Sequence, residues 1–315
     1  MSRTTVSYVL NATVGPSISE ATRQRVRDAA SRLGYTPSVA ARALRTGRSD
    51  LVLCVMPNWP IGPVIDTLLD HLATALADGG LSVLVHHGRG PRPLAELWRA
   101  VTPRAVVGFT TFAEDDERAM RQAGIQVLGA ALDEDPHHAG IFSVPQARIG
   151  RLQVQHLARS GHRRIGYAAP NDPRVAEFAD LRLAGVRAQC ADLGLPEPLV
   201  ESVDLEVASG SAAVRSWRAA APAVSAVAAY NDEVALAVLA GVRAEGLRVP
   251  EDVAVIGVDD IPAARLAAPA LTTVSQAIEA QAEYLAAAVV AALDGHGAPP
   301  ARSDDILAVI VRASA

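Results

Sequence analysis

Apolar residues recur at helical spacing in two stretches near the start of the chain. In 2–10, Val6, Val9 and Leu10 fall on one helical face, and in 19–33 five apolar residues do the same. The second stretch begins with a serine suited to capping, and a glycine suited to ending a helix follows it. The pattern predicts two helices in the first 35 residues.

A third, shorter helix is predicted at 39–45, where Pro37 precedes it and Gly47 follows it. A helix of about two turns is marginal in isolation, because nucleation costs more than a few hydrogen bonds return. This helix is therefore expected to form fully only when a partner holds it.

From residue 50 onward, apolar runs typical of buried strands alternate with amphipathic stretches typical of helices. Leu51–Met56 is a continuous apolar run, as expected of a strand buried on both faces. Two successive series of βα units predict an α/β fold with two doubly wound lobes, each built on a mostly parallel sheet. The predicted strands are Leu51–Met56, Leu81–Val85, Ala105–Phe109, Ile125–Leu128, Ile141–Ser143, Arg164–Ala168, Ser225–Ala229 and Val253–Gly257. The predicted helices are Val64–Ala77, Leu94–Val101, Gln146–Ser160, Leu181–Leu193, one around Trp217, and Asp232–Glu245.

Charge is distributed unevenly between the start of the chain and the rest. Residues 2–49 hold eight Arg and two acids, a net +6, whereas the whole chain carries −5 and the remainder therefore −11. A basic head on an acidic body indicates a polyanionic partner for the head alone.

Composition excludes several kinds of chemistry. All 29 basic residues are Arg, so no P-loop lysine and no Schiff-base lysine is available. Cys54 and Cys190 are isolated in the sequence, and we expect them to be buried, small hydrophobic residues in a reducing compartment. The histidine pairs at 86–87 and 137–138 are adjacent in sequence and are not expected to bind a metal. No apolar run is long enough to span a bilayer, and no motif indicates catalysis or a cofactor.

Polar residues follow two of the predicted strands directly. Asn231 and Asp232 come after Ser225–Ala229, and Asp259 and Asp260 come after Val253–Gly257. Ligands of doubly wound sheets bind beyond the carboxyl ends of the strands, so these residues are candidates for a binding site. The alternative is structural, because Asn231 and Asp232 also suit the cap of the following helix and Asp260 suits a turn.

Three motifs at consistent spacing carry a resemblance to a known family. The chain reads TVSYVLN at 5–11, ISEATRQRV at 18–26 and LGYTPSVAARALR at 33–45. Together they resemble the DNA-binding head of the LacI/GalR transcription repressors. Further segments, among them YNDEVALAVL at 230–239 and GVDDIP at 257–262, extend the resemblance over essentially the whole chain.

The resemblance implies a role in DNA recognition for the helix at 2–10. Arg3, Thr4 and Tyr8 take the positions that reach base edges in the major groove, and the planar fork of Arg3 suits guanine. Helix 39–45 matches the hinge helix, in which Leu44 takes the place of a leucine that wedges into the minor groove. The implied DNA-binding residues are Ser2, Arg3, Thr4, Thr5, Ser7, Tyr8, Asn11, Ala40, Leu44 and Arg45.

The resemblance also implies an effector site between the lobes, formed by Trp59, Arg182, Asn231, Asp259 and Gln276. Arg, Asn and Asp supply the donors and acceptors that hold hydroxyl-rich or anionic small molecules. Trp59 is expected either to stack on the face of a sugar ring or to cover the core as a lid. Many sugar-responsive members carry an Asp where this chain has Val144 and Pro145, which favours a more apolar, modified or non-sugar ligand over a plain hexose.

The head departs from the family at its beginning. The family has a first helix and a turn before the recognition helix, and here Met1 stands where the turn ends. We expect the reading frame to continue upstream by roughly fifteen residues that form this helix. Without it, residues up to about Asn11 are expected to fray, because Val6, Val9 and Leu10 lack a partner.

Together with the charge pattern, the resemblance implies a cytoplasmic, nucleoid-associated transcriptional regulator, most simply a repressor, that is not an enzyme. Its expected partners are a near-palindromic double-stranded DNA operator, a small-molecule effector such as a sugar or related metabolite, and a second copy in a homodimer. The alternative is a two-lobed sugar-binding protein without functional DNA binding. The expected domains are a partial helix-turn-helix head at 1–36, a hinge helix and linker at 37–49, and an effector-binding core at 50–315. Within the core, the first lobe is expected to cover about 50–146 and 276–305. The second lobe is expected to cover about 147–275 and 306–315.

Overall fold

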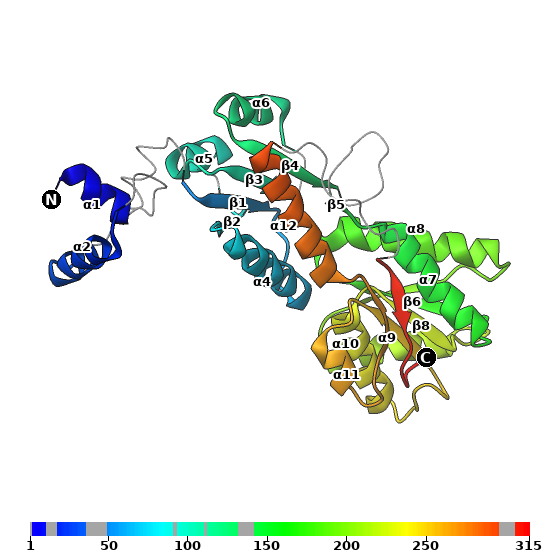
Figure 1. Cartoon of the computed structure of the whole chain (residues 1–315). Helices are drawn as coiled ribbons and strands as arrows, with labels where there is room; N and C mark the ends of the chain where they lie inside the picture. The colour runs from blue at the N-terminus through cyan, green and yellow to red at the C-terminus, as the bar shows by residue number, and fades with distance from the viewer. Residues whose placement is uncertain are drawn as a thin grey trace.

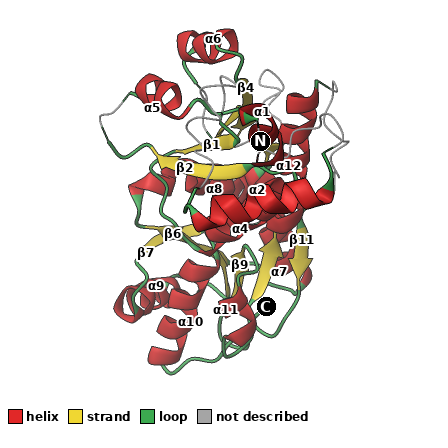
Figure 2. Cartoon of the chain, turned by 60° about the vertical axis from the view of Figure 1, so that its left-hand side comes forward, coloured by secondary structure: helices red, strands yellow, loops and turns green. Residues whose placement is uncertain are grey.

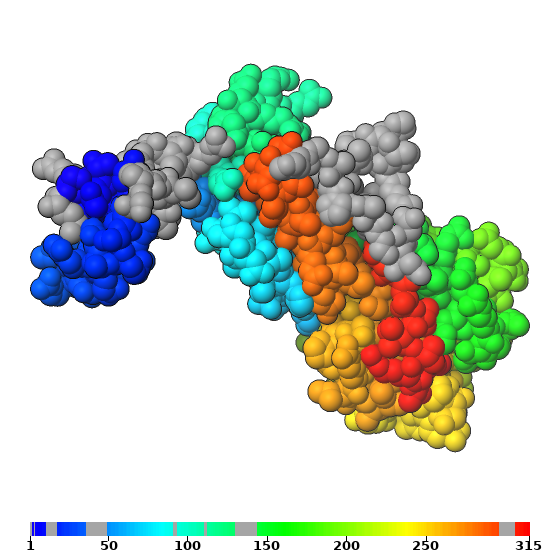
Figure 3. Space-filling model, in the orientation of Figure 1, coloured from blue at the N-terminus to red at the C-terminus, as the bar shows by residue number. Residues whose placement is uncertain are grey.

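A computed structural model gives the architecture of the chain (Figure 1). It describes residues 2–10, 18–35, 49–90, 93–109, 112–131, 142–295 and 306–315. Two helices form the head, α1 (Arg3–Leu10) and α2 (Glu20–Arg32). They lie side by side and stand away from the two lobes, as the space-filling view also shows (Figure 3).

The head helices stabilise each other through a small apolar contact. Val9 of α1 and Val26 of α2 are both buried, and Val6 and Leu10 are half-buried. Ser2 caps the start of α1, because its hydroxyl accepts a hydrogen bond from the Thr5 amide at 3.1 Å. The fraying expected for these residues is therefore wrong, since α2 supplies part of the missing apolar surface.

The first lobe is built on a five-stranded parallel sheet in the order β2-β1-β3-β4-β5. Its strands are β1 (Leu51–Met56), β2 (Ser82–His87), β3 (Ala105–Gly108), β4 (Gln126–Ala131) and β5 (Phe142–Ser143). Its helices are α4 (Pro63–Asp78), α5 (Leu94–Val101), α6 (Glu114–Gln122) and, from late in the chain, α12 (Ile278–Asp294), which packs beside α4.

The second lobe holds a six-stranded sheet in the order β11-β10-β9-β8-β6-β7, parallel except for the pair β10 and β11. Its strands are β6 (Ile165–Pro170), β7 (Leu199–Val203), β8 (Ala226–Ala229), β9 (Ala254–Val258), β10 (Thr272–Ser275) and β11 (Ala308–Ile310). Its helices are α7 (Gln146–Arg159), η1 (Pro173–Val175), α8 (Ala176–Asp192), α9 (Val207–Ala219), α10 (Asp232–Ala244) and α11 (Pro262–Leu266) (Figure 2).

Both lobes share one strand order, which confirms the predicted α/β architecture. In each sheet, the first strand of the lobe lies between the second and the third. The order in which the chain adds strands therefore reverses direction across the sheet at the pair β1 and β3, and again at the pair β6 and β8. The carboxyl ends of these pairs are the points at which such sheets bind ligands. The apolar pattern missed β7, β10, β11, η1, α6, α11 and α12, and it placed the start of α8 five residues too late.

Helices α7 and α8 approach unusually closely. A β-carbon on Gly185 of α8 would stand 1.9 Å from the carbonyl oxygen of Ala147 in α7, and one on Gly150 of α7 would stand 2.1 Å from that of Arg182. No residue with a β-carbon fits at either position unless the backbone moves. The two glycines therefore set the distance between the helices.

Gly185→Ala is expected to lower the free energy of unfolding by about 1–3 kcal/mol, because overpacking outweighs the better helix propensity of Ala. Urea denaturation followed by circular dichroism measures the change. Gly129→Ala is the matched control, since a β-carbon there meets no atom within 4 Å. Equal stability of the Gly185 variant and the parent protein would contradict the close approach.

Candidate functional site

A cavity of about 640 Å3 lies between the lobes, at the carboxyl ends of the strands where both sheets reverse. Loops after β1, β3, β6, β8 and β9 line it, together with the two described segments where the chain crosses between lobes, near Val144 and near Gln276. All five residues predicted for the effector site lie on its wall, namely Trp59, Arg182, Asn231, Asp259 and Gln276.

Arg182 is a buried cation of the cavity wall, with only 4% of its surface exposed. Its guanidinium donates to the side-chain oxygen of Gln146 at 2.7 Å and to the carbonyl of Tyr230 at 2.6 Å. It also lies over the Tyr230 ring, 4.7 Å from the centroid. Arg182 sits within α8 rather than at its start, so the close approach of α7 and α8 positions it.

Asp259 follows β9 and accepts a hydrogen bond from the side-chain amide of Gln276. Burial raises the pKa of Asp259 to about 6, and the nearby charge of Arg182 and the Gln276 hydrogen bond oppose this rise. Its φ of 111° and that of 55° at Asp260 lie in the region that favours glycine. The surrounding contacts must therefore hold two strained residues in place.

Asn231 and Asp232 have different tasks, and the capping role predicted for Asp232 is wrong. Asn231 is the N-cap of α10, where its side chain accepts from the Val234 amide at 2.9 Å. Asp232 is fully buried and accepts from the Ile261 amide at 2.9 Å and from the Thr273 hydroxyl at 2.6 Å. It thereby ties α10 to the strained turn after β9 and to β10.

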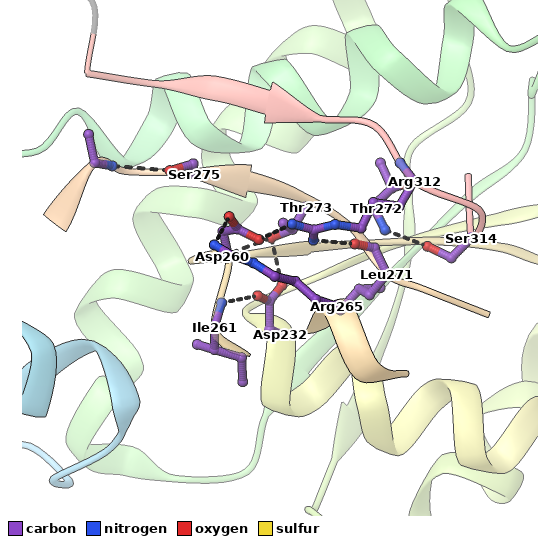
Figure 4. A network of polar contacts seen from close by, with 11 residues as sticks. Asp232, Asp260, Ile261, Arg265, Leu271, Thr272, Thr273, Ser275, Arg312 and Ser314 are labelled. Atoms are coloured by element: carbon purple, nitrogen blue, oxygen red, sulfur yellow. Dashed lines mark hydrogen bonds and ion pairs between the residues drawn. The ribbon is translucent and has the colours of Figure 1, made fainter. Parts of the chain in front are cut away.

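Asp260 anchors the other side of this turn (Figure 4). It pairs with Arg312 near the end of the chain and with Arg265 of α11, the latter at 3.0 Å. Asp260 is thus a turn residue, as the structural alternative predicted, and it does not line the cavity within the described wall. Asp232 and Asp260 together hold the backbone that presents Asp259 to the cavity.

Trp59 belongs to an aromatic cluster that bridges the lobes. Its ring meets Phe109 of the first lobe edge-on at 6.3 Å and Phe178 of α8 edge-on at 4.9 Å between centroids. Trp59 is half-buried and borders the cavity. Trp59 therefore covers apolar neighbours, as one of its two predicted roles requires, and its contact with a ligand stays a prediction.

Several wall residues escaped the sequence analysis. Phe178, Asp204 and Glu233 follow no predicted strand end, and Gln146 and Tyr230 were assigned only to a helix and a motif. Gln146 and Tyr230 carried a usable signal, because each stands within three residues of the end of a strand. Val144 borders the cavity, where the resemblance had placed a missing carboxylate.

The residues predicted to bind DNA are described only in part. Ser2, Thr4, Thr5, Ser7 and Tyr8 lie at the start of α1 or on it, with Thr4 exposed and Tyr8 half-buried. Arg3 begins α1, and its side chain lies outside the description. Asn11, Ala40, Leu44 and Arg45 also lie outside the described residues, as does the predicted hinge helix.

Other kinds of site find no support in the described parts of the chain. No group of three or more His, Cys, Asp or Glu there is arranged to hold a metal ion. No helix among these residues is long and apolar enough to cross a membrane. Cys54 and Cys190 are buried thiols, as predicted.

Asp232 makes the stability of the protein depend on pH. Burial raises its pKa to about 7, whereas an Asp in the unfolded chain titrates near 3.9. Between these values the folded state holds the proton more tightly, so stability is expected to fall as pH rises from about 4 to 7.

Asp232→Asn removes this contribution, which reaches at most about 1.4 kcal/mol per pH unit. The free energy of unfolding of the variant, measured by urea denaturation from pH 4.5 to 8, should therefore gain on that of the parent as pH rises. Two curves that stay parallel over this range would contradict the role of the buried carboxyl.

Two family descriptions match the chain. Residues 1–38 match the bacterial regulatory proteins of the lacI family, and residues 154–315 match the periplasmic binding protein-like domain. The transcriptional regulator CelR of Thermobifida fusca is 33% identical over 312 residues, which cover 95% of this chain and 91% of CelR.

Solved structures agree with this assignment. The complex of the transcriptional regulator CelR with cellobiose has a TM-score of 0.70 and 29% identity, over 100% of this chain and 96% of that one. The lac repressor dimer bound to operator and the anti-inducer ONPF has a TM-score of 0.77, over 99% and 94% of the two chains, and at 22% identity it bears on the fold alone. The head motifs, the two-lobed body and the extent of the likeness to CelR together establish that the chain belongs to the lacI family of bacterial transcription regulators.

Proposed function

We propose that this protein is a repressor that binds a near-palindromic operator as a homodimer and responds to a small molecule held between its lobes. The observation that carries the proposal is the convergence of Arg182, Asn231, Asp259, Gln276 and Trp59 on one cavity, in a chain that begins with a basic helical head. A sugar-binding protein without DNA binding would have no use for such a head, so the regulator is the better account. Its relatives are regulators rather than enzymes, and we assign it no catalytic role and place it at the nucleoid in the cytoplasm.

The proposed domains follow the boundaries expected from the sequence. The head at 1–36 reads DNA, the segment 37–49 connects head and body, and the lobes at about 50–146 with 276–305 and about 147–275 with 306–315 enclose the effector. Arg182 and Asp259 belong to the second lobe, whereas Trp59 belongs to the first. A ligand that contacts both sides favours one arrangement of the lobes, and this bias is the source of the coupling to the head.

The proposed effector is a sugar or a related metabolite. The CelR complex contains cellobiose, and it has 29% identity to this chain over its full length. Asn231, Asp259 and Arg182 supply the mixed donors and acceptors that hydroxyl groups require. Cellobiose is therefore a reasonable first probe.

The DNA-binding half of the proposal is tested by selection of binding sites from random duplex DNA. We expect a two-fold related site whose affinity falls steeply with salt, because counterions are released. Arg3→Ala should lose roughly 1–3 kcal/mol at one base pair per half-site and relax the preference there. Arg99→Ala, in an exposed position on the body, is the control. An equal loss on every sequence would make Arg3 a phosphate contact only.

The effector half is tested by Asp259→Ala. The variant should lose the effect of a bound ligand on operator affinity and keep its ligand-free affinity within about twofold, because Asp259 lies in the cavity and far along the chain from the head. Fluorescence anisotropy of labelled operator measures both quantities. Glu251→Ala, at the opposite end of β9, serves as the control. A ligand response that survives Asp259→Ala would place the effector at another site.

A further inference from the structure

The loop that follows β1 touches both lobes. Trp59 and Gly62 belong to this loop of the first lobe, and each meets a side chain of the second lobe. The Trp59 ring lies edge-on to that of Phe178 in α8, with 4.9 Å between the ring centroids. A β-carbon on Gly62 would stand 3.4 Å from a carboxylate oxygen of Glu233 in α10. All four residues border the cavity, so these contacts join the lobes at the cavity itself.

The first lobe holds this loop in place. Arg89, which follows β2, donates from its guanidinium to the Trp59 carbonyl at 3.0 Å. The Trp59 ring also lies 6.3 Å from the ring of Phe109, which follows β3. Helix α4 begins directly after the loop, at Pro63. The loop is therefore part of the first lobe, and its contacts with the second lobe resist separation of the two.

Gly62 leaves the start of α4 without a capping side chain of its own. Its φ of −138° and ψ of −179° are values that any residue can adopt, so the backbone does not require glycine here. A side chain that caps a helix begins at the β-carbon of this residue, and the carboxylate of Glu233 stands beside that point. The first N–H groups of a helix lack partners within the helix and carry a partial positive charge, which a carboxylate stabilises.

Glu233 lies where it can serve two helices. It belongs to the first turn of α10 and is half-buried. Both Pro63 at the start of α4 and Asn231 at the cap of α10 border the cavity, so each lobe brings a helix start to it. The partial positive charges of two such starts repel each other, and one carboxylate close to both offsets the repulsion. Within the described part of the chain, Glu233 forms no ion pair that would draw it elsewhere.

We propose that the loop at 59–62, the latch loop, holds the two lobes together when no ligand is bound. It does so through an aromatic contact with Phe178 and a charge contact with Glu233. Separation of the lobes breaks both contacts and exposes the Trp59 ring. The latch concerns the chain's own equilibrium between two arrangements of its lobes, so it holds whether or not that arrangement controls DNA binding.

The distance between the lobes tests the latch directly. Ala100→Cys on α5 and Ala212→Cys on α9 place one exposed cysteine on each lobe, and both carry spin labels for distance measurement by electron paramagnetic resonance. The native Cys54 and Cys190 are buried and do not compete for the label. Mixing with an excess of unlabelled chain removes distances between two copies from the signal.

Two substitutions weaken the latch without creating a large void. Glu233→Gln keeps the size of the side chain and removes its charge, and Phe178→Leu keeps an apolar side chain and removes the ring. We expect the ratio of joined to separated lobes to fall by about two- to fivefold in the first variant and by about two- to tenfold in the second. The double variant should therefore show a population with a longer distance between the labels. A distance distribution in the double variant that matches the parent overturns the inference.

Glu177→Gln and Phe112→Leu are the matched controls. Glu177 is an exposed acid in the first turn of α8, and Phe112 is a half-buried ring of the first lobe. Neither borders the cavity within the described wall, and neither change should alter the distances. Circular dichroism establishes that all variants fold. A shift in the controls as large as that in the latch variants overturns the assignment of the effect to the two contacts.

Tryptophan fluorescence gives a second readout. Trp59 is half-buried, whereas Trp98 and Trp217 are only 6% and 1% exposed, so quenching by acrylamide reports chiefly on Trp59. Glu233→Gln should increase the quenching, because separation of the lobes removes Phe178 from the ring. Unchanged quenching in this variant overturns the claim that the two contacts act as one latch.

Operator affinity distinguishes failure of this inference from failure of the proposed function. If the double variant separates the lobes and leaves the ligand-free operator affinity unchanged, the latch stands and the proposed coupling between lobes and head is wrong. If the distances stay unchanged, the latch is wrong, and the response of operator affinity to cellobiose still tests the proposed function.

Discussion

The architecture of the cavity depends on the hydrogen bonds of the buried Arg182 guanidinium. A buried charge is tolerated only when hydrogen bonds replace water, and here Gln146 and Tyr230 supply them. Gln146 begins α7 just after the chain crosses between the lobes, and Tyr230 follows β8. One side chain thus joins α8, the crossing and the end of a central strand. It reaches this position because Gly150 and Gly185 let α7 and α8 approach closely.

A second constraint lies behind Asp259. Its backbone and that of Asp260 are strained, and the turn is held by Asp232 from α10 and by Arg312 from the end of the chain. The residue proposed to contact the ligand therefore depends on side chains that do not line the described cavity wall. A ligand that moves Asp259 acts on this whole network, which suits a site whose task is to bias the arrangement of two lobes.

The sequence predicted the parts of this architecture that carry simple signals. Continuous apolar runs such as Leu51–Met56 gave the central strands, and polar residues after strands gave Asn231 and Asp259. The strand β10 escaped because Thr272 and Thr273 are fully buried polar residues, whose hydroxyls bond to the end of the chain and to Asp232. Asp232 itself was misassigned, because a sequence of two capping residues does not reveal which one turns inward. The close approach of α7 and α8, which places Arg182, depends on contacts between distant segments and has no local signal.

One cavity between the lobes is proposed to control the affinity of the head for DNA. A thermodynamic cycle on the full chain, with cellobiose as the ligand and the selected operator, measures this coupling most directly. Calorimetry gives the ligand affinity with and without saturating operator, and anisotropy gives the operator affinity with and without saturating ligand. Both affinities are expected to change by the same factor, of at least about fivefold, because coupling is reciprocal. A ligand that occupies the cavity with equal affinity in the presence and absence of operator would contradict it.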